Sequence, residues 1–333
     1  MAPFELVVFI IGVALVFDYV NGFHDAANSI ATVVSTRVLA PNVAVLWAAL
    51  FNFLAAYLLG TGVAATVGAG FVNIQMVTPW VVLAGLAGAI AWDVLTWYLG
   101  LPTSSSHALI GGYAGAAFAR AGIAGLVAGK WLVTIAFLVL SPIIGLVAAY
   151  LLMVGIYWAF RRFTPAKMDR HFRRYQLVSA ALFSCAHGTN DAQKTMGIIT
   201  ALLVAARLQN DFHVPTWVIA ASSGAIGLGT MSGGWRIVRT MGTRLTKLKP
   251  RSGFCAETGA AVSILFATWL GLPVSSTHAI AGAIAGVGSI QRTRAVRWHV
   301  AGGIVTAWVL TIPAAALMSA VVYFAIRVWE PGL

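Results

Sequence analysis

The sequence predicts an all-α polytopic membrane protein made of two inverted repeats, with broken helices and re-entrant hairpins. Of its 333 residues, 60% are hydrophobic and only 9% are charged, whereas soluble domains carry about 25% charged residues. Two patterns occur twice: a serine-rich segment after Pro102 and Pro273, and an aspartate motif centred on Asp25 and Asp191. Duplicated patterns in the two halves of an apolar chain are typical of membrane proteins with internal repeats.

The apolar segments form two groups of five around one basic stretch. We therefore divide the chain into an N-terminal membrane repeat at 1–160, a basic cytoplasmic loop at 161–174 and a C-terminal membrane repeat at 175–333. An odd number of crossings in each half would invert the second repeat relative to the first. The predicted apolar segments are 4–38, 43–68, 79–101, 103–119 and 122–160, then 175–206, 216–235, 254–272, 274–290 and 298–328.

The basic residues indicate which loops face the cytoplasm. The formal net charge is +12, but Lys and Arg gather in short loops, which favours the positive-inside rule over nucleic-acid binding. Basic residues flank the hairpin at 254–290 on both sides, whereas the loop before the first hairpin, 68–78, has no Lys or Arg. We expect a multi-pass protein of the cell (inner) membrane, without a nucleic-acid partner, whose two hairpins enter from opposite faces.

Each serine-rich segment predicts the tip of a helical hairpin. Proline ends the preceding helix, and Ser or Thr caps the next one, so that hydroxyls and free backbone N–H groups point the same way. Such a helix end binds anions, and two of them facing one another in a membrane would hold one anion. The alternative for each serine is a hydrogen bond to its own helix. The candidate anion-binding residues are Ser104, Ser105, Ser106, Ser275, Ser276 and Thr277.

Ionisable residues inside the apolar segments predict a second set of functional groups. Asp25 and Asp191 both have Gly at −3 and Ala at +1. Charged groups inside a membrane are costly and usually mark a pathway, and glycine beside Asn and Asp predicts broken helices that line a cavity. The alternative for Asp191 is a neutralising pair with Lys194 on the same helix face. Further candidates for proton or cation coupling are Lys194, His107, His278 and Glu257, then Asp93, while the role of Asp18 is open.

At these motifs the chain resembles the inorganic phosphate transporter (Pit) family of secondary carriers. The resemblance rests on GFHDAANSIAT at Gly22–Thr32, GLPTSSSH at Gly100–His107, HGTNDAQK at His187–Lys194 and GLPVSSTH at Gly271–His278. It implies a symporter of phosphate and a coupling cation, built from two inverted repeats and often a homodimer in the lipid membrane. It also places Asp25, Asn28, Asn190 and Asp191 on the cation and substrate motif, and the six hydroxyl residues on the substrate-binding tips.

The chain departs from the sodium-coupled members of that family. Lys194 stands where their second asparagine would be, which removes an oxygen ligand and adds a positive charge. The same departures resemble the bacterial low-affinity branch, which is proton-coupled and takes up neutral metal–phosphate complexes. The resemblance thus implies no cofactor and a coupling proton or metal–phosphate complex, with sodium less favoured. Asp25 and Asp191 are the candidate metal ligands.

Four other functions stay open at the level of sequence. The substrate can be sulfate or another oxyanion carried by the same family, or the phosphate symport can be sodium-coupled. Serine clusters followed by histidine also fit an intramembrane phosphatase acting on lipid phosphates, although this needs Ser, His and acid within hydrogen-bond reach. A channel would show weak contacts along a pore, whereas buried, duplicated carboxylates favour a carrier over both a channel and an enzyme.

Overall fold

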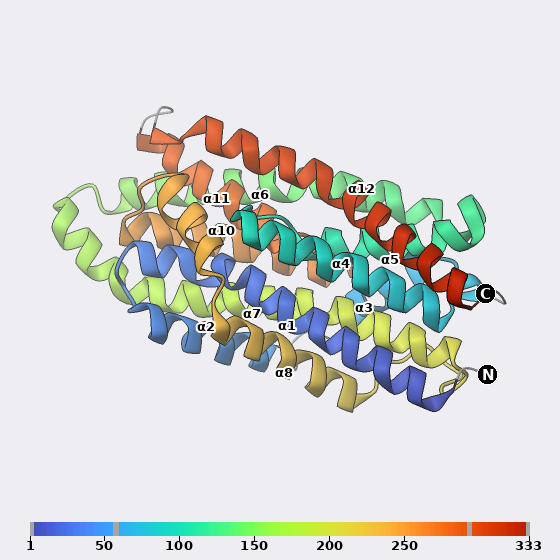
Figure 1. The fold of residues 1–333 in the computed structure, drawn as a ribbon. Helices are drawn as coiled ribbons and strands as arrows, with labels where there is room; N and C mark the ends of the chain where they lie inside the picture. Colours follow the sequence, from blue (N-terminus) through green and yellow to red (C-terminus); the bar gives the residue numbers. More distant parts are fainter. Residues whose placement is uncertain (1–2, 56–59, 292–294, 331–333) are drawn as a thin grey trace.

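The chain folds into long helices that run side by side, as a computed structural model shows (Figure 1). The structure describes residues 3–55, 60–291 and 295–330, and these contain no strand, so the all-α prediction is confirmed. The helices are α1 (Phe4–Ser35), α2 (Pro41–Ala55), α3 (Gly62–Gly70), α4 (Pro79–Leu99), α5 (Ser105–Ala121), α6 (Ala128–Ala159), α7 (Pro165–Ala205), α8 (Thr216–Ser232), α9 (Trp235–Arg239), α10 (Pro250–Trp269), α11 (Ser276–Gln291) and α12 (Trp298–Trp329).

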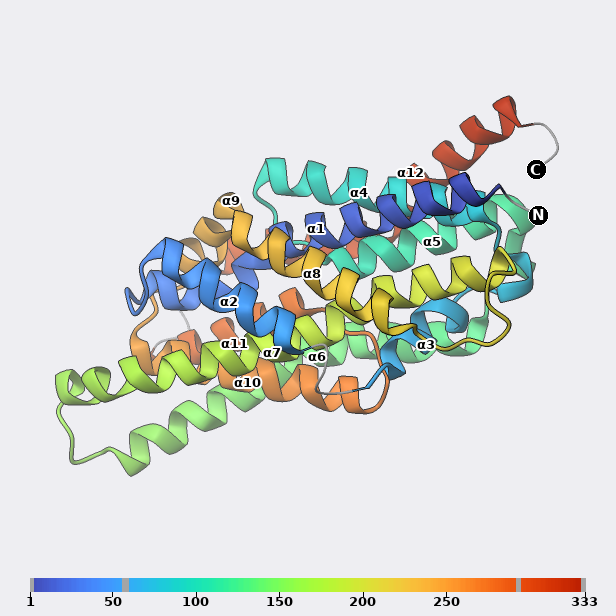
Figure 2. The same ribbon diagram turned by 90° about the horizontal axis from the view of Figure 1, so that it is seen from below.

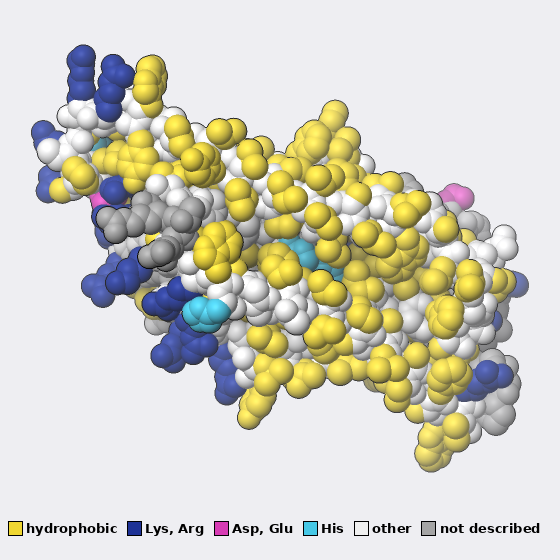
Figure 3. All heavy atoms as spheres, turned by 90° about the horizontal axis from the view of Figure 1, so that it is seen from above, with side chains coloured by type: hydrophobic (Ala, Val, Ile, Leu, Met, Phe, Trp, Pro, Cys, Tyr) yellow, Lys and Arg dark blue, Asp and Glu magenta, His cyan; other side chains and the backbone are white. Residues whose placement is uncertain are grey.

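The face of the molecule drawn in Figure 3 is apolar along most of its length. Large hydrophobic side chains such as Leu132, Trp269 and Val328 are at least 75% exposed, which suits contact with lipid rather than water. Four of the described helices are long and apolar enough to cross a membrane, namely α1, α4, α6 from Trp131 onward, and α12. Lys and Arg gather at one end of the face in Figure 3, as the positive-inside rule predicts for the cytoplasmic end.

The α4–α5 and α10–α11 hairpins extend toward opposite ends of the molecule (Figures 1 and 2). The first extends toward the end where the chain termini lie, and the second toward the basic end. Gly100 after α4 and Gly271 after α10 have the same left-handed conformation, φ 68°, which glycine adopts without strain. The hairpins thus have the opposite directions that the loop charges predict. The boundaries of the two repeats stay a prediction.

The long helix that follows each hairpin packs against the other hairpin. α6 packs on α10 and α11, and α12 packs on α4 and α5. Glycine allows the helices to come close: a Cβ added to Gly282 of α11 would lie 2.1 Å from the carbonyl oxygen of Pro142, and one on Gly115 of α5 would lie 2.4 Å from that of Ala316. Small residues at such contacts are typical of membrane helices. The two halves therefore interlock.

The helices that carry Asp25 and Asp191 are continuous, so the prediction of broken helices at these two motifs is wrong. α1 and α7 run through them without interruption. The motif glycines serve close packing instead, because a Cβ on Gly22 would lie 2.1 Å from the carbonyl oxygen of Ile226, and one on Gly188 would equally clash with α2. The interruptions lie at the hairpin tips.

The basic stretch at 161–174 is mostly helical rather than a loop. α7 begins at Pro165, which suits the first turn of a helix, and the hydroxyl of Thr164 accepts a hydrogen bond from the backbone N–H of Lys167 at 3.4 Å. Arg251 of α10 then binds Asp169 at 2.6 Å, so the start of α7 is tied to the second hairpin. Residues 160–164 connect α6 to α7.

The contact between α11 and α6 yields a test of the interlocked packing. Gly282→Ala should lower the unfolding temperature in detergent, because overpacking a tight contact costs about 1–3 kcal/mol. Gly155→Ala is the matched control, since this α6 glycine has no atom within 4 Å of an added Cβ. Equal unfolding temperatures for the two variants would contradict the packing described.

Candidate functional site

The two hairpin tips meet on the carboxylate of Asp191. The hydroxyl of Ser106, at the start of α5, donates to one carboxylate oxygen at 3.4 Å, and that of Ser276, at the start of α11, donates to the other at 3.0 Å. Asp191 itself lies on α7 and is fully buried. One side chain thus binds two helix N-termini that reach it from opposite ends of the molecule.

Asp25 of α1 lies on the other side of the second tip. Its carboxylate accepts a hydrogen bond from Thr277 at 3.4 Å, and Asn28 donates to the hydroxyls of Thr277 at 2.9 Å and Ser276 at 3.4 Å. The start of α11 is therefore held between α1 and α7, with one aspartate on each side. The duplicated aspartates and the second serine tip therefore lie together in the folded chain.

Ser104 and Ser275 cap the helices, whereas the residues after them face the aspartates. The hydroxyl of Ser104 accepts from the backbone N–H of His107 at 3.3 Å, and that of Ser275 from the backbone N–H of His278 at 3.1 Å. Ser105 is buried near Asp93, and no hydrogen bond of ordinary distance and angle joins its hydroxyl to any described residue. Capping orients the free N–H groups of each first turn toward the centre.

Lys194 places a buried positive charge at this centre. Its ammonium group contacts the Asp191 carboxylate and the hydroxyl of Ser106, and it donates to the carbonyl oxygen of Val274 at 2.9 Å. Lys194 is one turn beyond Asp191 on α7, which is why the two side chains meet. The neutralising pair considered from sequence is present, and it also holds both hairpin tips.

His187 and His24 belong to the site, and sequence reasoning did not select them. His187 Nδ1 lies 2.8 Å from the Asp191 carboxylate and 3.1 Å from the hydroxyl of Ser276, while His24 Nδ1 lies 2.9 Å from the Asp25 carboxylate. The available signal was spacing: His187 is four residues before Asp191, on the same helix face.

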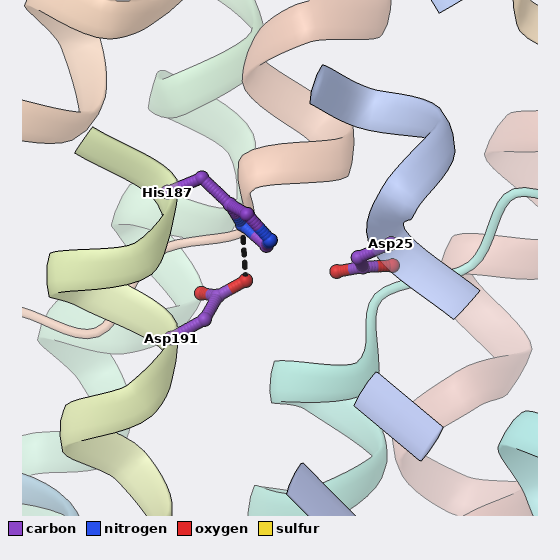
Figure 4. Close-up of side chains that lie close together, drawn as sticks. All are labelled: Asp25, His187 and Asp191. Atoms are coloured by element: carbon purple, nitrogen blue, oxygen red, sulfur yellow. Dashed lines mark ion pairs between the residues drawn. The ribbon is translucent and has the colours of Figure 1, made fainter. Parts of the chain in front are cut away.

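Asp25, His187 and Asp191 face one another across the interface of α1 and α7 (Figure 4). One ligand atom from each lies within 4.8 Å of the others. Imidazole and carboxylate together suit divalent transition metals better than alkali ions. The trio includes both aspartates that the sequence marked as candidate metal ligands.

Asn190 forms hydrogen bonds with the turn that leads into the second tip. Its amide nitrogen donates to Thr268 at 2.7 Å and to the carbonyl oxygen of Leu272 at 3.3 Å, and its amide oxygen accepts from the backbone N–H of Val274 at 3.4 Å. These partners span the turn between α10 and α11. Its contacts in this structure therefore go to the chain around the tip, and none goes to the Asp25 and Asp191 carboxylates.

His107 and His278 contact each other one turn behind the tips. Their ring centroids are 4.7 Å apart, and His278 stacks on Trp308 of α12 at 3.8 Å. Each follows its capping serine by three residues, so the two rings join α5 to α11. They lie beside the centre, where neither forms an ion pair with an aspartate in the described part of the chain.

Glu257 lies in a separate polar cluster between α1, α7 and α10. Its carboxylate accepts hydrogen bonds from Gln176 at 3.0 Å and from the hydroxyls of Thr32 and Ser179. Thr32 is one turn beyond Asn28 on α1, so this cluster adjoins the centre without joining it. Glu257 is fully buried and satisfied by neutral donors alone.

A buried polar centre bounded by two hairpins of opposite direction defines a membrane transport protein. Residues 21–319 match the phosphate transporter family, and the chain belongs to that family. It is a multi-pass protein of the cell (inner) membrane and a transporter rather than an enzyme, so the phosphatase alternative is wrong.

Similar proteins cover nearly the whole chain. A protein of Rhizobium meliloti (strain 1021) named "Probable low-affinity inorganic phosphate transporter" is 56% identical, with 97% of each chain covered. One of the same name from Bacillus subtilis (strain 168) is 45% identical, with 96% of each covered. A solved structure titled "The sodium-dependent phosphate transporter" superimposes with a TM-score of 0.90 at 23% identity, covering 97% of this chain and 99% of that one, which shows the fold.

Substitution of one tip hydroxyl tests whether the tips form the anion site. Ser276→Ala should weaken phosphate binding by roughly tenfold or more, because a hydrogen bond to a charged group is worth about 1.5–3 kcal/mol. Ser289→Ala on the same helix, whose hydroxyl donates to the carbonyl oxygen of Gly286, should bind phosphate like the parent protein. Equilibrium binding to purified protein measures both, and an unchanged affinity in Ser276→Ala would remove this tip from the site.

Proposed function

We propose that the chain is a secondary active symporter that carries inorganic phosphate together with a positive charge. The observation that carries the proposal is the meeting of Ser106 and Ser276, from two separate helix N-termini, on Asp191. Hydroxyls and N-terminal N–H groups donate hydrogen bonds to a tetrahedral anion without a fixed full charge. Ser105, Ser106, Ser276 and Thr277 are the proposed phosphate ligands, with Ser104 and Ser275 as caps.

The opposite directions of the hairpins support alternating access. Each hairpin has its tip near the centre and its open end toward a different end of the molecule (Figures 1 and 2). Movement of the tips relative to α1 and α7 would uncover Asp25 and Asp191 to one side at a time. The bonds that such movement breaks are those from Ser106, Ser276 and Thr277 to the two aspartates.

A positive charge has to accompany the phosphate because Asp25 and Asp191 repel it in a medium of low dielectric constant. Each ligand then lowers the cost of the other by the same free energy, which is coupling. Lys194 already neutralises Asp191, so Asp25 is the carboxylate left for the coupling charge. An ammonium group beside a sodium site would repel the ion, and we therefore favour a proton or a metal ion carried with phosphate.

A divalent metal bound to phosphate fits the trio of Asp25, His187 and Asp191. Their ligand atoms lie within 4.8 Å of one another, and the serine tips adjoin them. In this proposal the metal is cargo: it reaches the site already complexed with phosphate, and the neutral complex adds no net charge to the site. A proton held by the same groups would serve the same purpose with free phosphate.

Two further features follow from the family rather than from the site. Phosphate is preferred to sulfate as the substrate because the curated bacterial relatives are named as phosphate transporters. A homodimer in the lipid membrane, which the family resemblance implies, is our proposal for the assembly. Neither feature changes the arrangement of the hairpin tips.

Removal of the Asp25 carboxylate tests the coupling. Asp25→Asn should reduce gradient-driven phosphate uptake into proteoliposomes by at least about tenfold, since its loss removes the charge that the coupling ion offsets. Glu5→Gln, an exposed acid at the start of α1, is the control and should transport normally. Uptake by Asp25→Asn at the rate of the parent protein would refute this coupling mechanism.

Replacement of the buried ammonium group tests the exclusion of sodium from the centre. Lys194→Asn should make phosphate uptake respond to an imposed sodium gradient, because it restores an oxygen ligand and removes the repelling charge. The parent protein should respond to a proton gradient or to added divalent metal instead. A parent already driven by a sodium gradient would show that Lys194 does not exclude the ion.

A further inference from the structure

A second polar cluster lies between α1, α7 and α8, away from the hairpin tips. The carboxylate of Asp18 on α1 has the hydroxyls of Thr195 on α7 and Ser222 on α8 beside it. Asn21 follows three residues later on the same face of α1. All four side chains are at most 1% exposed. The cluster is therefore shielded from lipid and from water.

No hydrogen bond of ordinary distance and angle joins the polar atoms of this cluster to any described residue, although the Thr195 and Ser222 hydroxyls lie near the Asp18 carboxylate. This holds for both carboxylate oxygens of Asp18, the amide oxygen of Asn21 and the hydroxyls of Thr195 and Ser222. Asp18 also forms no ion pair in the described part of the chain, whereas Asp191 has Lys194 beside it. An isolated buried carboxylate costs several kcal/mol unless a positive charge compensates it.

We propose that Asp18, Asn21, Thr195 and Ser222 form a binding site for a monovalent metal cation, with sodium as the ion. Hard metal ions take oxygen ligands, and this set offers only oxygens. One carboxylate matches a single positive charge. Oxygens that share an ion lie near one another without being hydrogen-bonded, which is the arrangement around Asp18.

The site is separate from the moving parts that transport requires. It lies among α1, α7 and α8, which pack against one another, and none of its four residues belongs to a hairpin. Asp18 is close enough to Asp191 for the two carboxylates to repel each other. A cation at Asp18 offsets that repulsion, so the ion stabilises the bundle around the phosphate site without travelling with phosphate.

Direct binding of radioactive sodium to purified protein, in phosphate-free buffer balanced with choline, tests the proposal. The parent should bind sodium saturably, Asp18→Asn should lose this binding, and Asp25→Asn should keep it. Absence of saturable binding in the parent, as expected if Asp18 holds a proton instead, would overturn the proposal. So would parent-like binding by Asp18→Asn.

A second variant covers the case in which Asp18→Asn does not fold. Ser222→Ala should keep the fold and weaken sodium binding by about tenfold, since it removes one ligand oxygen. Ser232→Ala, an exposed serine near the end of the same helix, is the matched control and should bind sodium like the parent. An unchanged sodium affinity in Ser222→Ala would exclude its hydroxyl from the site and refute the proposal.

Discussion

The interior of this protein is built around the need to compensate the carboxylate of Asp191. A charge buried in a membrane costs several kcal/mol, and Asp191 is fully buried. Four side chains meet that cost together: Lys194, His187 and the hydroxyls of the two hairpin tips. Because these partners come from different parts of the chain, the compensation of one charge also brings the two halves together.

The packing of the long helices stabilises each hairpin, whereas the contacts at the hairpin tips can break and re-form. α6 and α12 each support the hairpin of the other half, with glycines that let the helices approach closely. The tips, by contrast, are held to α1 and α7 mainly by hydrogen bonds. Hydrogen bonds to hydroxyls exchange readily for hydrogen bonds to phosphate oxygens, so phosphate can take the place of the contacts that close the centre.

Much of this site could be predicted from the sequence because it is duplicated. Asp25, Asp191 and the serine tips stand at matching places in the two halves. His24 and His187 escaped notice because they stand one and four residues before their aspartates, so an alignment on the aspartates does not superimpose them. Their roles depend on neighbours that only the folded chain supplies.

The fold was predictable in class and orientation but not in its helix breaks. Glycine beside Asn and Asp predicts an interruption, yet the same glycine is needed where two helices touch, as Gly22 is against Ile226. The sequence of one helix cannot show whether a glycine interrupts the helix or allows close packing, because the atom that the glycine contacts belongs to another helix. The start of α7 at Pro165 was also not predicted, because basic residues suit an exposed helix as well as a loop.

The most direct test of the central claim is the position of a bound phosphate analogue in crystals of the protein. Arsenate has the shape of phosphate, and its arsenic atom can be located by anomalous scattering. We predict one arsenic peak between the hydroxyls of Ser106 and Ser276, beside Asp25 and Asp191. A peak elsewhere in the molecule, with the two tips still closed on Asp191, would contradict the account.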